Sequence, residues 1–458
     1  MSQHGTPRKP TSIISIHIGQ AGVQIGTAMW HLLLHEHGLN PRGFKENGDR
    51  CLDSQAQVMF HQWSGPKFTA KACFIDSDEY TLSNLRSGPL SDVFQWNYVM
   101  HTCAESGGLY SRGNFVVAEE VVDKVVKYVR QMAEESDNPC GFLFTHSLGG
   151  GTGSGVTARL LNVLKTEYPK AAQVELAVMP SQKMKSNNTL IVEPYNISLF
   201  LKDTMEEHRA VIVVDNEALF RMVYSTGSKT PNYNSINSIL AHVLSATTAG
   251  TRYGGFKSVG FRDIETTVVA SKRLRFASAS FAPLAHDLSS CHNIVAVSEV
   301  MHDLFSPRRQ LLTADFHDPF VITSTVLYRS YLDSLGEVQT FINKLINTKT
   351  LRFVPWAPAA IKIGLAQSPT GFLPVGEILH VPESATLLYN TTAVIKPFEH
   401  IYHCVSSMLR KRAFLHWYTR SGMFADELTL AQDSLSELIS DYSETASPDP
   451  CSDESECQ

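Results

Sequence analysis

Residues 145–155 read Thr-His-Ser-Leu-Gly-Gly-Gly-Thr-Gly-Ser-Gly and follow an apolar run at 142–144. Five of the seven residues from 149 to 155 are glycine. Glycines allow successive backbone N–H groups to face one anion, and the helix predicted at 156–164 adds the positive end of its dipole. The stretch therefore predicts a phosphate-binding loop between a strand and a helix.

Other interpretations of this stretch fit less well. The order His146-Ser147-Leu148 resembles the nucleophile elbow of lipases, but that elbow needs a small residue two places before the serine, where this chain has the β-branched Thr145. No HGGG-type oxyanion loop lies upstream. The run is neither a Walker A loop nor a G-x-G-x-x-G dinucleotide motif. A glycine-rich turn without a ligand is the remaining alternative to phosphate binding.

Short β-branched runs alternate with helical patterns in the first half of the chain. Valines at helical spacing between 121 and 129 predict a helix at 118–132. Strands separated by helices imply βα units around a parallel sheet, in which ligands bind beyond the carboxyl ends of the strands. The predicted strands cover 13–18, 72–76, 142–145, 174–178 and 210–215. Their carboxyl ends carry Gly19, Gln20, Asp76, the glycine run, Asp215 and Asn216.

After residue 216 the pattern mixes strands with longer helices. Strands are predicted at 266–270, 321–328, 352–356 and 362–365, and helices at 398–409 and 428–439. A mixed α/β region followed by a helical end is therefore expected.

The composition is that of a globular chain with an acidic end. The 458 residues are about three times the ~150 residues of a typical domain, so two or three packed units are expected. The net charge is 39 − 45 = −6, and residues 441–458 hold six acids without Lys or Arg, which leaves the rest of the chain neutral. No basic stripe therefore points to nucleic acid. The acidic end either binds basic partners or is a solvated terminus that binds nothing.

Cysteine usage and hydropathy indicate a soluble intracellular chain. The eight cysteines form no C-x-x-C pair and no zinc-type spacing with histidine, so reduced thiols are expected. No apolar segment follows the basic residues near the N-terminus, and no run approaches ~18 apolar residues. No membrane span is expected.

Several motifs together resemble one family. The Gly-Gly-Gly-Thr-Gly-Ser-Gly run at 149–155 is the signature loop of the tubulins, and Gly-Gln-Ala-Gly-Val-Gln-Ile-Gly at 19–26 is similar to the family's first phosphate loop in its alpha-tubulin form. The chain is thereby identified as a member of the tubulin family, apart from its start and its end. Further matching stretches lie in family order at 192–196, 214–218, 355–356, 390–392 and 412–418.

The resemblance implies an α/β fold with a Rossmann-like, parallel-sheet GTPase domain, a mixed α/β intermediate domain and a helical C-terminal region. The implied divisions are an N-terminal extension (1–10), a GTP-binding domain (11–215), an intermediate domain (216–391), a helical C-terminal domain (392–440) and a disordered acidic tail (441–458).

The resemblance also implies a site for GTP or GDP. Gln20 and Ala21 would contact the phosphates and Glu193 the ribose. Asn216 and Asn237 would bind the guanine edge, because an amide offers it both a donor and an acceptor. The ring of Tyr233 would stack on the base; the alternative for Tyr233 is a position in the core. The nucleotide-binding residues so implied are Gln20, Ala21, Gln24, Gly149, Gly150, Gly151, Thr152, Gly153, Glu193, Asn216, Tyr233 and Asn237.

A magnesium ion is implied beside the phosphates. Asp76 and Asp78 in the second loop, with Glu105 in the third, supply the hard oxygen ligands that Mg²⁺ prefers, largely through water. A helix cap is the alternative role for Asp76. The third loop departs from the family, because Gly108 and Leu109 stand where the family has two asparagines. Altered sensing of the γ-phosphate is therefore expected, unless backbone amides compensate.

Hydrolysis in the family is completed between subunits by an acid of the neighbouring chain. Asp263, within Phe-Arg-Asp-Ile-Glu-Thr at 261–266, aligns with the alpha-type glutamate and is one methylene shorter. It would act in trans on a neighbour's nucleotide, positioning water as in other GTPases. A surface carboxylate without a catalytic role is the alternative.

Other departures disfavour a bulk microtubule subunit. Residues 284–297 match little of the family's lateral-contact pattern, and the tail lacks a glutamate run and a terminal tyrosine. The chain looks most like the zeta-tubulins, which implies a cytoplasmic cytoskeletal component of centrioles, basal bodies or cilia, with head-to-tail contacts to other tubulins and with centriolar or basal-body proteins as partners. The alternatives are a conventional alpha-like microtubule subunit and a structural scaffold without GTP turnover.

Overall fold

The structure is a computed structural model of the chain. It describes residues 12–46, 53–62, 65–134, 139–181, 190–225, 232–255, 257–284, 296–313, 319–331, 334–357, 361–371 and 383–445.

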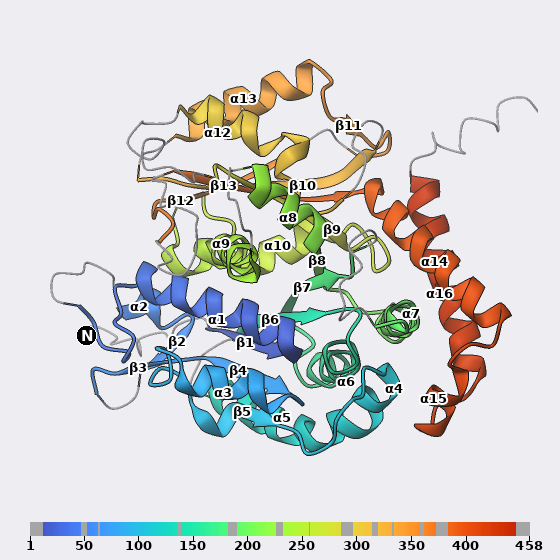
Figure 1. The fold of residues 1–458 in the computed structure, drawn as a ribbon. Helices are drawn as coiled ribbons and strands as arrows, with labels where there is room; N and C mark the ends of the chain where they lie inside the picture. The colour runs from blue at the N-terminus through green and yellow to red at the C-terminus, as the bar shows by residue number, and fades with distance from the viewer. Residues whose placement is uncertain are drawn as a thin grey trace, which may run out of the picture.

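One large sheet runs through the molecule (Figure 1). Its strands lie in the order β11-β10-β13-β9-β8-β7-β6-β1-β4-β5, with β12 paired to β10. The bounds are β1 (Ser12–Ile18), β4 (Ala72–Asp76), β5 (Val99–His101), β6 (Pro139–Ser147), β7 (Ala172–Met179), β8 (Ala210–Asp215), β9 (Phe276–Ala282), β10 (Phe320–Arg329), β11 (Arg352–Phe353), β12 (Lys362–Ala366) and β13 (Ser384–Thr391). A separate antiparallel pair joins β2 (Phe60–Gln62) and β3 (Phe68–Ala70).

The sheet is parallel from β9 to β5, whereas β13 runs antiparallel to both β9 and β10. All residues of β1, β7 and β8 are buried, as expected for parallel strands that helices cover on both faces. The chain leaves β1 toward β4 on one side and returns to β6 on the other. This reversal makes the carboxyl ends of β1 and β6 the switch point at which such folds bind ligands.

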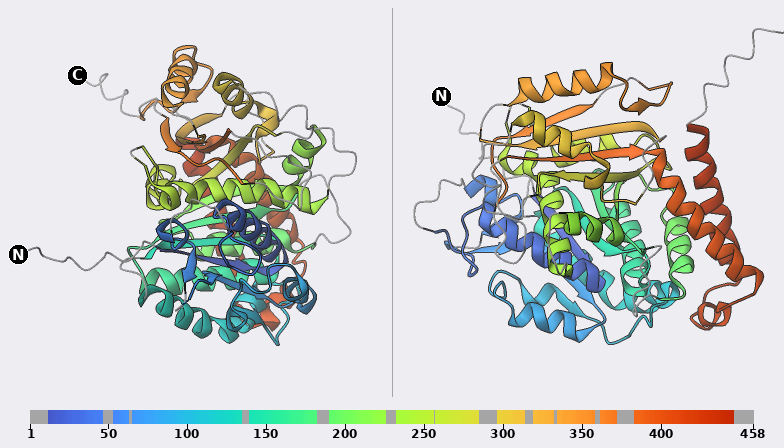
Figure 2. Two further views of the ribbon diagram at one scale, coloured as in Figure 1. Left: turned by 90° about the vertical axis from the view of Figure 1, so that its left-hand side faces the viewer. Right: turned by 45° about the horizontal axis from the view of Figure 1, so that its top comes forward.

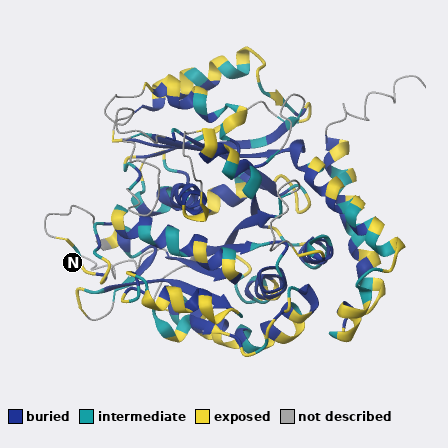
Figure 3. Ribbon diagram, in the orientation of Figure 1, coloured by how far each residue is buried: buried dark blue, intermediate teal, exposed yellow. Residues whose placement is uncertain are grey.

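Helices cover the sheet in layers. Their bounds are α1 (Gly19–Glu36), α2 (Asp53–Ala56), α3 (Glu79–Ser87), α4 (Tyr110–Arg112), α5 (Ala118–Glu134), α6 (Gly151–Glu167), α7 (Glu193–Asp203), α8 (Asn216–Ser225), α9 (Tyr233–Tyr253), α10 (Phe261–Val268), α12 (Val297–Leu304), α13 (Leu335–Asn347), α14 (Ile395–Arg410), α15 (Leu415–Arg420) and α16 (Asp426–Thr445). Buried strands and inner helix faces form the core, and the outer helix faces are exposed (Figure 3).

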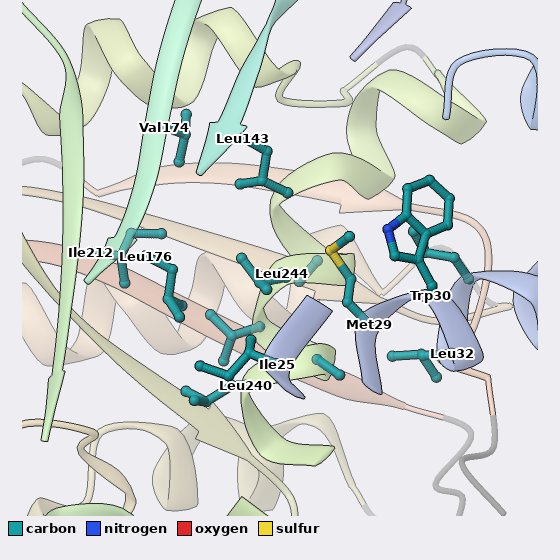
Figure 4. Packing of buried hydrophobic residues seen from close by; sticks show 14 of the residues in the cluster. Ile25, Met29, Trp30, Leu32, Leu143, Val174, Leu176, Ile212, Leu240 and Leu244 are labelled. Carbon is teal, nitrogen blue, oxygen red and sulfur yellow. The ribbon is translucent and has the colours of Figure 1, made fainter. Parts of the chain in front are cut away.

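Helices α1 and α9 pack together on one face of the parallel strands. Met29 and Trp30 of α1 and Leu244 of α9 belong to the same apolar cluster as Leu143 and Leu176 of the sheet (Figure 4). The opposite face is covered by α5, α6 and α7, and then by the antiparallel pair α14 and α16 along the outside (Figure 2). Helices α12 and α13 cover β9, β10 and β13.

Three sequence-based predictions need correction. The strand expected at 266–270 lies mostly in α10, because Phe261, Ile264 and Val268 share one buried helical face that overrides local β-propensity. The strand expected at 352–356 shortens to β11. The helix expected from 156 begins already at Gly151, so most of the glycine run forms its first turns.

The C-terminal helix is longer than expected. Helix α16 continues to Thr445, five residues past the expected end of the helical region at 440. Tyr442 explains the extension: it is buried, and its hydroxyl accepts from Phe276 N at 3.0 Å. The expected N-terminal extension (1–10), residues 446–458 and most of 284–297 lie outside the described residues. In the described ranges, no helix is long and apolar enough to span a membrane, and Cys73, Cys103 and Cys404 are free thiols.

Candidate functional site

The first loop turns sharply between β1 and α1 at the switch point. Gly19 has a φ of +72°, and a Cβ on it would lie 3.3 Å from Gly153 N. A Cβ on Gly22 would lie 2.2 Å from Thr145 O. Because only glycine allows both approaches, these two positions seat the first loop against the end of β6 and the start of α6.

The predicted residues of this loop face the open edge. Gln20 and Gln24 are exposed and Ala21 is partly buried. Gln24 also lines a cavity of about 200 Å³ that reaches Asn237 of α9. Asn237 is 8 % exposed. The cavity thus places a predicted nucleotide-binding residue of α1 beside a predicted base-reading residue of α9.

The other two residues predicted to bind the base lie outside this cavity. Asn216 is the first residue of α8 and is partly buried. Tyr233 is 54 % exposed at the start of α9, with its ring 5.6 Å from that of Phe220. Tyr233 is therefore not a core aromatic, and its ring is open to a stacking partner.

Three loops meet at one hydroxyl in the glycine run. Thr152 Oγ1 lies 2.9 Å from Ser106 Oγ of the third loop and 3.0 Å from Ser77 Oγ of the second loop. Gly151 and Gly153 are buried beside it, and a Cβ on Gly150 would meet nothing within 4 Å. Thr152 was predicted from the sequence, whereas the two serines that tie the other loops to it were not.

Asn196 of α7 is a second tie between the loops. Its Nδ2 donates to Gly108 O at 2.8 Å and to Gly149 O at 2.7 Å. Its Oδ1 accepts from Tyr110 N at 2.9 Å and from Tyr418 OH of α15 at 2.7 Å. A fully buried amide thereby joins the third loop, the glycine run and the C-terminal helices.

Glu193, the predicted ribose ligand, begins α7 beside the glycine run. Its Oε1 accepts from Leu190 N at 3.3 Å. A Cβ on Gly149 would lie 2.9 Å from its Cγ, so the missing side chain at position 149 leaves room for Glu193 against the glycine run. Burial raises the pKa of Glu193.

The three predicted magnesium ligands differ in their surroundings. Asp76 is 3 % exposed, and its Oδ2 is buried without a hydrogen-bond partner. Asp78 is the exposed N-cap of α3 and accepts from Tyr80 N at 3.0 Å. Glu105 is exposed. In the described part of the chain, no three His, Cys, Asp or Glu side chains form a metal-binding group. The orphaned oxygen of Asp76 fits a hard cation whose other ligands are water and phosphate oxygens.

Asp76 also carries a cost in stability. Burial raises its pKa from 3.8 to about 6, so the nucleotide-free fold loses stability as the pH rises from about 3.8 to about 6, and the whole loss is present at pH 7. Asp76→Asn is expected to raise the free energy of unfolding at pH 7 by about 1–3 kcal/mol. Denaturant unfolding of the ligand-free protein at pH 7 measures the change. The exposed Asp92→Asn is the control; loss of stability in Asp76→Asn without ligand would contradict the prediction.

Asp263 lies at the opposite end of the sheet. Phe261, two residues earlier, contacts the start of β6, since a Cβ on Gly141 would lie 2.9 Å from its ring. Glu265, two residues later, accepts from Gln173 N at the start of β7 at 3.2 Å. Asp263 is exposed and accepts from Gly260 N at 3.0 Å. It therefore lies at the amino ends of the strands, far from the chain's own phosphate loops.

Comparison with known proteins assigns this arrangement to a family. The model of the Tubulin/FtsZ family GTPase domain matches residues 12–224, and that of the tubulin C-terminal domain matches residues 272–403. The chain is 34 % identical to the tubulin alpha-3 chain of Saccharomyces cerevisiae, over 94 % of this chain and 97 % of that one. The chain belongs to the tubulin family. It is also 31 % identical to the tubulin alpha-1 chain of Schizosaccharomyces pombe and to the tubulin alpha-2 chain of Caenorhabditis elegans, in each case over 94 % of this chain and 96 % of the relative.

Membership makes this tubulin part of a cytoskeletal family of GTP-binding proteins, and the α/β fold predicted from the sequence is confirmed. Of the residues singled out from the sequence, Gln24 and Asn237 line one cavity, and Thr152 lies where the loops meet. Sequence reasoning missed Asn196, Ser77 and Ser106. Asn196 stood in a matched stretch, but no residue pattern showed that its partners would be backbone groups of two distant loops.

Proposed function

We propose that this tubulin binds GTP or GDP with Mg²⁺ at the carboxyl edge of its parallel sheet. The observation that carries the proposal is that the first, second and third loops and the glycine run meet at the switch point, beside the cavity lined by Gln24 and Asn237. In this proposal, the phosphates lie at the start of α6, Asp76 faces the ion through water, and Glu193 faces the ribose. Asn216, Tyr233 and Asn237 bind guanine.

The nucleotide content of the purified protein tests this proposal directly. Denaturing freshly purified protein and separating the released nucleotides by chromatography should give about one equivalent of GTP or GDP. Released GTP would indicate slow turnover, and GDP would indicate completed hydrolysis. No guanine nucleotide, even after incubation with GTP and Mg²⁺, would overturn the proposal and leave a tubulin-shaped scaffold.

We further propose that hydrolysis is completed between neighbouring subunits stacked head-to-tail. The support is geometric: Asp263 and the phosphate loops lie at opposite ends of one sheet, so a stacked neighbour would bring its acid to this chain's nucleotide. The side chain points into solvent but is anchored by Gly260 N, which limits its rotamers before a neighbour arrives.

Asp263→Ala is expected to lower GTP turnover on a stacked neighbour by about 100-fold, the usual worth of a positioned acid or base. The chain's own nucleotide affinity should not change, because the residue is far from its own site. Single-turnover hydrolysis in co-assembly with a partner tubulin measures the first effect and nucleotide release the second. Thr266→Ala, an exposed neighbour on the same helix, is the control. Equal turnover in Asp263→Ala and wild type would leave Asp263 as a surface carboxylate.

The cellular role we propose is that of a specialised, zeta-like member at centrioles or basal bodies in the cytoplasm. The support is the altered third loop and the acidic tail without a glutamate run. The similarity to alpha chains favours a second role, that of an ordinary alpha-like microtubule subunit. Fluorescent tagging separates them: signal at basal bodies only supports the first, and signal along microtubule shafts supports the second.

A further inference from the structure

The third loop is covered by a leucine from the segment before α7. Gly107 and Gly108 both have left-handed backbones, with φ of +56° and +72°. A Cβ on Gly108 would lie 2.9 Å from Leu190 Cδ1 and 3.1 Å from Leu190 Cδ2, whereas a Cβ on Gly107 would meet nothing within 4 Å. Leu190 therefore occupies the space that a side chain at position 108 would need.

This covered position adjoins the start of the phosphate helix. A Cβ on Gly151, the first residue of α6, would lie 2.7 Å from Gly108 C and 2.5 Å from Leu109 N. The third loop is thus pressed against the helix end that attracts anions. Leu190 is 36 % exposed, so its methyl groups cover the third loop and also face the open side.

The backbone of the third loop has other partners. Gly108 N donates to Ser106 Oγ at 3.4 Å, Leu109 N to Ser106 O at 3.1 Å and Tyr110 N to Asn196 Oδ1 at 2.9 Å. Three consecutive N–H groups are therefore used inside the protein and do not compensate for missing side-chain donors. With Leu190 above them, this end of the site has an apolar surface.

We propose that Leu190 determines the nucleotide preference of this site, so that GDP binds at least as tightly as GTP. The inference rests on the proposed nucleotide site. A terminal phosphate that meets methyl groups loses water without gaining a hydrogen bond, which is unfavourable for a charged group. A phosphate that meets an amide donor gains a charge-assisted bond. Leu190 therefore removes the advantage that GTP would otherwise have.

The test compares GTP and GDP affinities in full-length variants. Wild type should bind the two nucleotides within about threefold of each other. The double variant Gly108→Asn with Leu190→Ala should favour GTP at least about tenfold more than wild type does, because the terminal phosphate gains a hydrogen bond from the new amide. Leu190→Asn, which places an amide over an unchanged loop, should shift the preference in the same direction.

Two single variants check the steric argument. Asparagine tolerates left-handed backbone, so Gly107→Asn should melt close to wild type. Gly108→Asn should melt at a lower temperature, and adding Leu190→Ala should restore much of the loss. A wild-type preference for GTP of more than about threefold, or an unchanged preference in both Leu190 variants, would overturn the inference alone. Loss of binding to both nucleotides in wild type would instead overturn the proposed function.

Discussion

Glu36→Gln is expected to lower the free energy of unfolding by about 3–5 kcal/mol, because it leaves two buried guanidinium groups without their counter-charge. The Glu36 side chain is 0 % exposed at the end of α1. Its Oε2 lies 2.7 Å from Arg252 Nη1 of α9, and its Oε1 lies 2.7 Å from Arg329 Nη1 of β10. Denaturant unfolding measures the loss, and the exposed helical variant Glu399→Gln is the matched control.

The pH dependence gives a second readout of this ion cluster. Burial alone would raise the pKa of Glu36, but Arg329 and Arg252 hold it well below its usual range. A carboxylate with a depressed pKa stabilises the fold above its ordinary pKa of about 4.5, and this stabilisation is lost as the pH falls below that value. Wild type should therefore lose stability between pH 5 and pH 3 more steeply than Glu36→Gln. The midpoints of denaturant unfolding, measured from about pH 7 to pH 3, test this expectation. Parallel curves would contradict the assignment.

Asn196→Ala is expected to have the second-largest effect, about 3–4 kcal/mol of unfolding free energy, because it orphans buried backbone groups at Gly108, Gly149 and Tyr110. It should also weaken guanine-nucleotide binding by at least about tenfold, since both phosphate loops lose their common partner. Denaturant unfolding and nucleotide release measure the two effects.

Tyr418→Phe is the matched control for Asn196. It removes only the hydroxyl that donates to Asn196 Oδ1 at 2.7 Å and leaves the ties to both loops in place. It should cost about 1 kcal/mol and change nucleotide affinity little. Equal losses of affinity in the two variants would mean that the C-terminal helices, rather than the amide, hold the loops.

The parallel strands were predictable from sequence because burial on both faces forces continuous apolar, β-branched runs, as in β1 and β8. The prediction of a strand at 266–270 was wrong because the β-branched residues there favour a strand locally. Phe261 and Ile264 upstream are buried on one face of α10, and their packing stabilises the helix instead. Local propensity gave way to tertiary packing.

The parts of the fold and of the site that escaped prediction depend on contacts between distant segments. Glu36 and Arg252 look like ordinary surface charges until the ends of α1 and α9 meet. Leu190 looks like a loop residue until it covers Gly108. Motifs report the residues that face a ligand, whereas the groups that hold those residues in place leave no local pattern.

The opposite placement of the phosphate loops and Asp263 also restricts how copies can associate. A two-fold axis brings like surfaces together, so it would pair two nucleotide edges or two acid edges and complete neither. If copies are instead stacked by repeated translation along the strand direction, the nucleotide edge of each interior copy faces the Asp263 edge of its neighbour. On the proposed function, such a filament is directional: one tip carries a nucleotide that no acid reaches, and the other carries an acid that has no nucleotide. A protein that caps it must recognise different chemistry at each tip.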